Sequence, residues 1–314
     1  MHGITNAKTM RPATRMLWLD LTRKCQLQCS HCYNASGPQG AHGGMTLQDW
    51  LSVLDQAAAH GVSAVQFIGG EPTMHPGFAD LVDHALTLGL KVEVFSNLVH
   101  VSNECWSLFR RKGLSLATSY YADQAEAHNR ITARPSHART RTNIEKAVQF
   151  GIPLRVGIID GGEGQRVSET RRDLEGLGVT RIGVDHVRPF GRGARDQAPD
   201  PANLCGRCGI GKAAIDPNGD VSPCVFSGHV RVANVKTTPL ATILDSTAMA
   251  DANQTIRAAV RADSQEKGKC YPDATPCSPA QPPCDPYMGL PPACNPDDGE
   301  CGPGVPSGHC NPRR

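Results

Sequence analysis

Three cysteines lie within eight residues of one another near the start of the chain. Cys25, Cys29 and Cys32 form a Cys-x3-Cys-x2-Cys spacing in "RKCQLQCSHCYN", directly after the apolar run "MLWLDLT". Closed metal sites usually take about four protein ligands, whereas catalytic sites leave one position open. Three thiolates can hold three irons of a [4Fe–4S] cluster and leave the remaining iron for an outside ligand. A structural zinc site or a group of core cysteines are the alternatives that this spacing alone leaves open.

A second motif, "GGEP", stands at the carboxyl end of another predicted strand. It contributes Gly69, Gly70 and Glu71. Glycine lets the backbone approach a ligand closely, and a glutamate carboxylate can pair with an ammonium group. A ligand with both an α-amino and an α-carboxyl group could therefore chelate the open iron while this segment orients its ammonium.

Both motifs need a scaffold that brings the ends of different strands together. Short β-rich runs alternate with amphipathic segments, and the predicted strands cover residues 16–22, 64–70, 91–97, 114–121, 153–160 and 181–191. Successive β–α units predict parallel strands with right-handed crossovers. A complete barrel of this kind has about eight units. We therefore predict an α/β fold, a partial (β/α)6 TIM-type barrel with a small Cys-rich C-terminal extension.

Local signals mark the helices between these strands. The helix after the cysteine segment opens with Thr46 and Asp49 at the spacing of a capping box. Ligands of parallel β/α folds bind in the loops beyond the carboxyl ends of the strands. Both motifs follow predicted strands directly, so we expect them on the same face of the fold.

Composition and charge restrict the class of protein. The chain has 314 residues, a net charge of +2, 39% hydrophobic and 20% charged residues, without the excess of Lys and Arg of a nucleic-acid-binding protein. The start of the chain has no apolar signal region, and no run approaches the ~20 apolar residues that span a bilayer. We predict a cytoplasmic protein with no nucleic-acid or membrane partner. Because the cytosol keeps thiols reduced, the 13 cysteines indicate metal or iron–sulfur ligation rather than disulfides.

The motifs together resemble those of the radical S-adenosylmethionine (radical SAM) enzymes. The resemblance rests on "CQLQCSHC", "GGEPTMHP" and "VFSN", and it covers roughly residues 14–195. In that family the methionine part of S-adenosylmethionine chelates the unique iron. One electron from the cluster cleaves the sulfonium, and the 5′-deoxyadenosyl radical takes a hydrogen atom from the substrate. The resemblance implies a [4Fe–4S] cluster, S-adenosylmethionine and an electron donor such as flavodoxin or ferredoxin.

The resemblance also assigns residues. It implies cluster ligation by Cys25, Cys29 and Cys32, with His31 in the usually aromatic position before the last cysteine. It places Gly69, Gly70 and Glu71 at the methionine amino group and Ser96, Asn97 and Ser119 near the ribose. Tyr121 stands where an acidic residue is expected, so no acid–base role is carried over to that position.

A second set of cysteines follows the predicted barrel. The segment 205–224 resembles the start of the SPASM and twitch extensions, which carry auxiliary [4Fe–4S] clusters. Asn218-Gly219 predicts a hairpin turn that returns the chain toward the preceding cysteines. The resemblance implies at least one auxiliary cluster, with the ligands Cys208 and Cys224 and the further candidates Cys205 and Cys270. The Cys-x2-Cys pair also occurs in zinc knuckles, which is the alternative.

The composition divides the chain into a lead-in (1–15), the barrel (16–195), the auxiliary-cluster segment (196–269) and a Pro- and Cys-rich tail (270–314). The tail has too few apolar side chains to form a core, which is typical of disorder. Its six cysteines leave open a second cluster, a zinc site, free thiols or a fused substrate. With about fifteen residues before the first strand, we expect no N-terminal leader-recognition domain.

Three functions follow from the resemblance and the motifs. SPASM-bearing relatives imply an enzyme that modifies a ribosomally synthesised peptide by crosslinking, epimerisation or oxidation. A dehydrogenase or epimerase of a small molecule such as a sugar or aminocyclitol is the alternative. A non-catalytic iron–sulfur carrier is the third, and the "GGEP" motif argues against it.

Other polar or reactive residues receive no catalytic role. Arg155 faces the barrel interior, where it could bind a substrate carboxylate or pair with a carboxylate of the barrel wall. His75 is expected to cap or brace a loop, and Cys105 to pack in the core.

Overall fold

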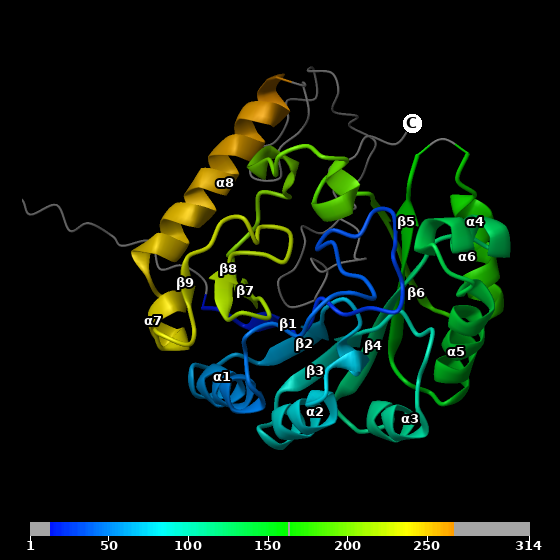
Figure 1. Cartoon of the computed structure of the whole chain (residues 1–314), viewed down its shortest axis with the longest axis horizontal. Helices are drawn as coiled ribbons and strands as arrows, with labels where there is room; N and C mark the ends of the chain where they lie inside the picture. Colours follow the sequence, from blue (N-terminus) through cyan, green and yellow to red (C-terminus); the bar gives the residue numbers. More distant parts are fainter. Residues whose placement is uncertain (1–12, 163, 267–314) are drawn as a thin grey trace, which may run out of the picture.

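The computed structural model describes residues 13–162 and 164–266. Within these residues nine strands form one sheet in the order β6-β5-β4-β3-β2-β1-β7-β8-β9 (Figure 1). The parallel strands are β1 (Met16–Asp20), β2 (Ala64–Ile68), β3 (Lys91–Phe95), β4 (Leu114–Tyr120), β5 (Leu154–Asp160), β6 (Arg181–His186) and β7 (Lys212–Ile215). The antiparallel strands β8 (Asp220–Ser222) and β9 (Ala233–Asn234) complete the sheet.

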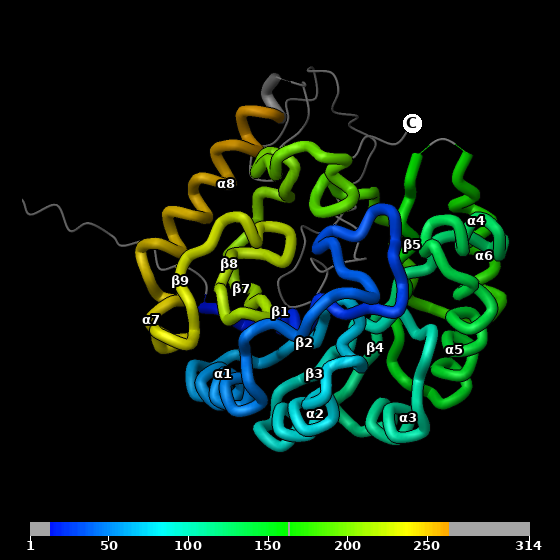
Figure 2. The backbone as a smooth tube through the Cα atoms, viewed as in Figure 1, coloured from blue at the N-terminus to red at the C-terminus, as the bar shows by residue number. Residues whose placement is uncertain are grey.

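Helices cover the outer side of the curved sheet, except that the last helix packs through Ile256 and Val260 against Cys208 and Cys224. They are α1 (Leu47–Ala59), α2 (Phe78–Thr87), α3 (Asn103–Phe109), α4 (Ala125–Thr132), α5 (His137–Gln149), α6 (Val167–Gly176), α7 (Leu240–Leu244) and α8 (Thr247–Glu266), with the 3-10 turns η1 (Pro72–Met74), η2 (Gly191–Ala194) and η3 (Pro201–Asn203). Figure 1 shows α1, α2 and α3 in sequence along the outside of the strands. The loop after β1 lies inside the curve (Figure 2).

The alternation of side chains along β1 separates two apolar layers. Leu17 and Leu19 pack outward with Trp50 of α1 in the main core. Met16 and Trp18 face the other way and join a smaller inner cluster. Because successive side chains of a strand point to opposite faces, Asp20 shares the inner face with Trp18. The inner face therefore receives polar as well as apolar side chains.

The predicted order of the six parallel strands is confirmed. The sequence prediction extended most of these strands too far at their carboxyl ends. The residues 69–70 and 96–97 belong to loops, and β6 ends at His186. Beyond the end of β2 the chain stays hydrogen-bonded to the loop after β1, since the N–H of Gly70 donates to the carbonyl of Thr22 at 2.6 Å. The pairing of β7 with β1, which extends the sheet, was not predicted.

The predicted capping box and hairpin turn are both confirmed. The N–H of Asp49 donates to Thr46 Oγ1 at 3.2 Å, and the N–H of Thr46 donates to Asp49 Oδ2 at 2.8 Å. Gly219 closes the turn between β7 and β8 with a φ of 89°, a value that favours glycine. No helix in the described part of the chain is both long and apolar enough to cross a membrane.

Candidate active site

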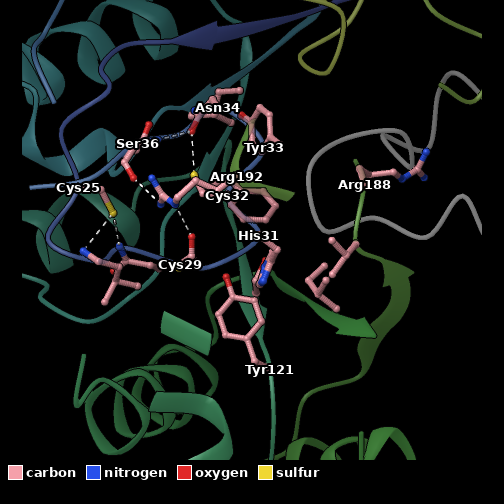
Figure 3. Close-up of a pocket in the computed structure, with 18 of the residues that line it drawn as sticks. Cys25, Cys29, His31, Cys32, Tyr33, Asn34, Ser36, Tyr121, Arg188 and Arg192 are labelled. Carbon is pink, nitrogen blue, oxygen red and sulfur yellow. Dashed lines mark hydrogen bonds between the residues drawn. The ribbon is translucent and has the colours of Figure 1, made fainter. Parts of the chain in front are cut away.

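A pocket opens at the carboxyl ends of the parallel strands, on the inner side of the loop after β1. It is lined by all three cysteines of that loop and by Gly69, Gly70, Asn97 and Ser119. Of the barrel residues predicted to bind the cluster or S-adenosylmethionine, Glu71 and Ser96 are absent from the lining. Cys25 lies at one end of the pocket and Arg188 at the other (Figure 3). Residues from the ends of the six strands β1 to β6 thus meet in one cavity.

Amide side chains contact two of the three thiols. Asn97 Nδ2 donates to Cys25 Sγ at 3.6 Å, and the N–H of Leu27 donates to the same sulfur at 3.4 Å. The thiol of Cys32 donates to Asn34 Oδ1 at 3.0 Å. Hydrogen bonds to cluster sulfurs help to set the reduction potential of an iron–sulfur site. These contacts therefore suit a cluster whose cysteine ligands lie on one loop and whose reduction potential is adjusted by neighbouring amides.

Arg192 of η2 holds the cysteine loop from the opposite side. Its Nε donates to the carbonyl of Cys29 at 2.7 Å, and its Nη2 donates to the carbonyl of Ser36 at 2.7 Å. Its own backbone N–H donates to the carbonyl of Cys32 at 2.9 Å. The fixed fork of the guanidinium is suited to such paired contacts. One side chain therefore sets the shape of a loop that has little regular structure.

Cys25 and Cys29 of this loop are protonated in the cluster-free protein. Burial raises the pKa of Cys25 to about 12, and the nearby carboxylate of Glu71 adds to the effect. Burial likewise raises the pKa of Cys29 to about 12, reinforced by Cys32. Because only a thiolate ligates metal, loading this site must release protons.

The "GGEP" segment packs directly against the cysteine loop. A side chain at Gly70 would place its Cβ 2.4 Å from the carbonyl oxygen of Lys24 and 2.9 Å from Cys25 Cβ. A Cβ at Gly69 would lie 2.8 Å from the carbonyl oxygen of Thr22. The glycines are thus required by the close approach of the two loops, whereas the sequence analysis assigned them to close approach of a ligand.

The carboxylate of Glu71 points into the protein rather than into the pocket. It accepts hydrogen bonds from Thr73 Oγ1 at 2.8 Å and from the backbone N–H of Asn97 at 2.8 Å. Burial raises its pKa, and the hydrogen bond from Asn97 opposes this effect. Ser96 is also buried, and its Oγ accepts from the N–H of Leu98 at 3.1 Å. In the described contacts these two side chains brace the loops after β2 and β3.

Aromatic rings close the pocket. The rings of His31 and Tyr121 meet edge to face with centroids 5.0 Å apart, and those of Tyr33 and Phe226 lie 4.9 Å apart. Burial lowers the pKa of His31 to about 4, and the charge of Arg192 adds to this effect, so the ring is neutral at pH 7. Tyr121, which replaces the expected acidic residue, therefore belongs to an uncharged wall.

The hairpin brings the second set of cysteines together. Cys208 and Cys224 are buried among Phe190, Leu204, Ile256 and Val260, and Cys205 packs against this group. The thiol of Cys208 forms hydrogen bonds with both Cys205 and Cys224. The hydrogen bond between Cys208 and Cys205 lowers the pKa of Cys205 and raises the pKa of Cys208. The predicted ligand Cys270 lies outside the described residues.

No group of three or more His, Cys, Asp or Glu side chains in the described ranges is arranged for a single metal ion.

Residues that received no catalytic role have structural contacts. Arg155 forms a two-point ion pair with Glu93, at 2.8 Å from Nε and 2.7 Å from Nη2, so the barrel-wall alternative is confirmed. His75 ends η1 and accepts through Nδ1 from the N–H of Gly77 at 3.1 Å. Cys105 lies in α3, partly buried against the main core.

No role was predicted for Arg192, Asn34 or Phe226. One signal for Arg192 was present in its neighbour Gly191, which has a φ of 53° and whose added Cβ would lie 2.4 Å from the carbonyl oxygen of Cys32. A glycine followed by a long cation can mark a segment that approaches another loop. The fold alone reveals which loop that is.

The match to known families agrees with this geometry. The model of the Radical SAM superfamily matches residues 19–176, half of the chain. The chain belongs to the radical SAM superfamily. The model of the SPASM iron–sulfur cluster-binding domain matches residues 203–278 and includes the second cysteine set. The predicted family, its partial-barrel fold and its iron–sulfur and S-adenosylmethionine cofactors are thereby confirmed.

Curated relatives cover the same part of the chain. A PqqA peptide cyclase of Streptomyces rochei is 29% identical over 182 residues, 57% of this chain and 50% of the relative. An AdoMet-dependent heme synthase of Methanosarcina barkeri is 25% identical over 197 residues, 62% of this chain and 56% of the relative. This radical SAM chain thus spans about half the length of the curated relatives that it matches.

Solved structures share the fold. Streptococcus suis SuiB bound to S-adenosylmethionine superposes with a TM-score of 0.65 at 17% identity, over 79% of this chain and 68% of SuiB. BtrN in complex with AdoMet and 2-DOIA superposes with a TM-score of 0.54 at 14% identity, over 81% of this chain and 92% of BtrN.

Proposed function

We propose that this radical SAM protein reductively cleaves S-adenosylmethionine and removes a hydrogen atom from a ribosomally synthesised peptide, leading to a crosslink, an epimerised residue or an oxidised residue. The observation that carries the proposal is the single pocket in which the three thiols of one loop face Gly69, Gly70, Asn97 and Ser119. The similarity to PqqA peptide cyclases supports a peptide as the substrate. SuiB, whose structure is known bound to its precursor peptide SuiA, supports the same class.

The residues of the pocket fit the cofactors. Cys25, Cys29 and Cys32 would ligate a [4Fe–4S] cluster, with Gly69 and Gly70 beside the amino acid part of S-adenosylmethionine and Asn97 and Ser119 beside its ribose. Cluster and S-adenosylmethionine together supply a carbon-centred radical that can break an unactivated C–H bond. The chain positions the cluster through Arg192 and Asn97, and the rings of His31, Tyr33, Tyr121 and Phe226 shield this end of the pocket from water.

The part of the pocket near β5 and β6 is the proposed substrate end. It is lined by Ile159, Asp185, His186 and Arg188. Asp160 and His186 face each other across the strand ends, with Oδ2 and Nδ1 3.6 Å apart. Arg188 is paired with Asp185 at 3.1 Å, so its charge is held in place before a substrate arrives.

Two further assignments belong to the proposal. An electron donor such as flavodoxin or ferredoxin would reduce the cluster. Cys205, Cys208 and Cys224 would hold an auxiliary cluster, with Cys270 as the candidate for the remaining ligand.

Hydrogen transfer to the cofactor tests the substrate class. The reconstituted full chain would be incubated anaerobically with dithionite, S-adenosylmethionine and a deuterated candidate substrate. Peptides encoded beside the gene would be compared with aminocyclitols and sugars. Deuterium in 5′-deoxyadenosine from a peptide, absent with the Cys29→Ala variant, would support the proposal. Deuterium transfer only from a sugar or aminocyclitol would replace it with the small-molecule function.

A further inference from the structure

Lys212 is a buried cation beside the second set of cysteines. It begins β7 and is 5% exposed, and its Nζ has no hydrogen-bond partner among the described residues. Its recorded contact is the ring of Trp18, whose centroid lies 5.8 Å from Nζ. A buried ammonium without an anion beside it is unfavourable, because it has lost its hydration. The aromatic ring compensates this loss only partly.

Lys212 lies next to the cysteine set. The ring of Trp18, which faces Lys212 Nζ, packs in a cluster with Ala214 and Val225. Val225 also packs against Cys208 and Cys224. Arg188 lies over the ring of Phe226, which packs against the same two cysteines. Arg188 is neutralised by Asp185, whereas no salt bridge to Lys212 occurs in residues 13–162 and 164–266. The three thiols thus lie beside one compensated and one uncompensated cation.

An anion at the cysteines would supply the missing counter-charge. A cluster held by thiolates carries a net negative charge, and every added electron makes it more negative. The cysteines come from two segments, 205–208 and 224. The hairpin brings both segments into one cluster with Phe190. Lys212 lies between these segments in the chain and follows Cys208 by four residues. The hairpin that gathers the thiols therefore also brings the cation to them.

We propose that Lys212 is the built-in counter-charge of an anionic iron–sulfur cluster on Cys205, Cys208 and Cys224, and that it raises the reduction potential of that cluster. The inference rests on the auxiliary cluster in the proposed function. Lys212 is a positioning residue in this account, since it acts on the cluster through its charge and ligates nothing. The same cation destabilises the cluster-free fold, because there it has no anion to offset its burial.

The test uses the full chain with Cys25, Cys29 and Cys32 changed to Ala, so that the auxiliary cluster alone is titrated. Anaerobic potentiometric titration with dithionite as reductant, followed by EPR, gives its one-electron potential. Lys212→Met should lower the equilibrium constant for reduction about tenfold or more. A tenfold change corresponds to about 59 mV for a one-electron couple. Lys212→Arg keeps the charge and should keep the potential of the parent.

Lys91→Met is the matched control, because Lys91 begins β3 as Lys212 begins β7 but is exposed. Its potential should equal that of the parent. Thermal unfolding of the cluster-free proteins gives a second readout, in which Lys212→Met should unfold at the same or a higher temperature than the parent.

Three results would overturn the inference. They are an unchanged potential in Lys212→Met, a parent that retains no cluster, and equal loss of the cluster from the Met and Arg variants of Lys212. A parent without a cluster would also remove the auxiliary cluster from the proposed function. All three results leave the cleavage of S-adenosylmethionine by the wild-type chain, on which the proposed function depends, to be tested separately.

Discussion

The guanidinium of Arg192 donates from Nε to the backbone carbonyl of Cys29 at 2.7 Å, although 163 residues separate the two in the chain. The same side chain reaches the carbonyl of Ser36 at 2.7 Å. The loop that carries the three thiols is therefore fixed by a residue that follows the last strand of the barrel. We therefore expect cluster retention on this loop to depend on a residue that lies beyond the sixth strand.

Arg192→Met should loosen the cysteine loop and weaken cluster retention. Each hydrogen bond to a charged donor contributes about 1.5–3 kcal/mol, and the variant loses two of them. We expect faster loss of iron to a chelator under anaerobic conditions. Arg195→Met is the control, because Arg195 is exposed on the same turn and should release iron at the wild-type rate. Equal rates in all three proteins would show that the loop holds its shape without Arg192.

Glu93→Gln should destabilise the fold because it leaves a buried cation in the barrel wall. The Arg155 side chain is 10% exposed and its ion pair with Glu93 is two-pointed. Removing one partner of a buried pair costs about 3–5 kcal/mol. Chemical unfolding would measure this loss, and Arg155→Met combined with Glu93→Gln should recover much of it. A Glu93→Gln variant of normal stability that no longer turns over substrate would instead indicate a substrate-binding role for the pair.

Gly70→Ala should distort the contact between the "GGEP" segment and the cysteine loop. The added Cβ would lie 2.4 Å from the carbonyl oxygen of Lys24, which is backbone and cannot simply rotate away. Overpacking of this kind costs about 1–3 kcal/mol. Gly176→Ala adds the same methyl group where nothing lies within 4 Å, so it should not lower stability. Equal unfolding midpoints for the two variants would contradict the close approach.

The cluster-free protein should lose stability in alkaline solution through Cys25 and Cys29. Their folded-state pKa values are raised to about 12 from an unfolded value of 9.0. A group whose pKa is raised by folding stabilises the fold fully below its unfolded pKa, and this contribution falls as pH rises from about 9 toward 12. Cys25→Ser with Cys29→Ser removes both titrations. The unfolding free energy of the wild type, relative to this variant, should decline above pH 9. A difference that stays constant with pH would contradict the burial of these thiols.

The sequence predicted the elements whose signals are local. Thr46 and Asp49 marked a helix start, Asn218-Gly219 marked a hairpin, and six apolar runs marked the parallel strands in the right order. The motif at Gly69 and Gly70 was also readable, because close backbone approach requires glycine. These features depend on residues near one another in the chain.

Contacts between distant segments were not predictable in the same way. Nothing near Lys212 indicates that β7 pairs with β1, or that its ammonium is buried beside Trp18. Glu71 was expected to meet a ligand, whereas its carboxylate accepts from Thr73 and the backbone of Asn97. A buried carboxylate and a ligand-binding carboxylate look identical in sequence, and only packing separates them.

The most direct test of the central claim is anaerobic formation of 5′-deoxyadenosine, measured together with iron content after reconstitution. The wild type and the Cys25/Cys29/Cys32→Ala variant would be compared with dithionite and S-adenosylmethionine. The wild type should form 5′-deoxyadenosine, whereas the variant should form none while keeping the about four irons of one auxiliary cluster. Formation of 5′-deoxyadenosine by the variant, or none by an iron-loaded wild type, would contradict the assignment of the Cys25–Cys32 loop as the site that cleaves S-adenosylmethionine.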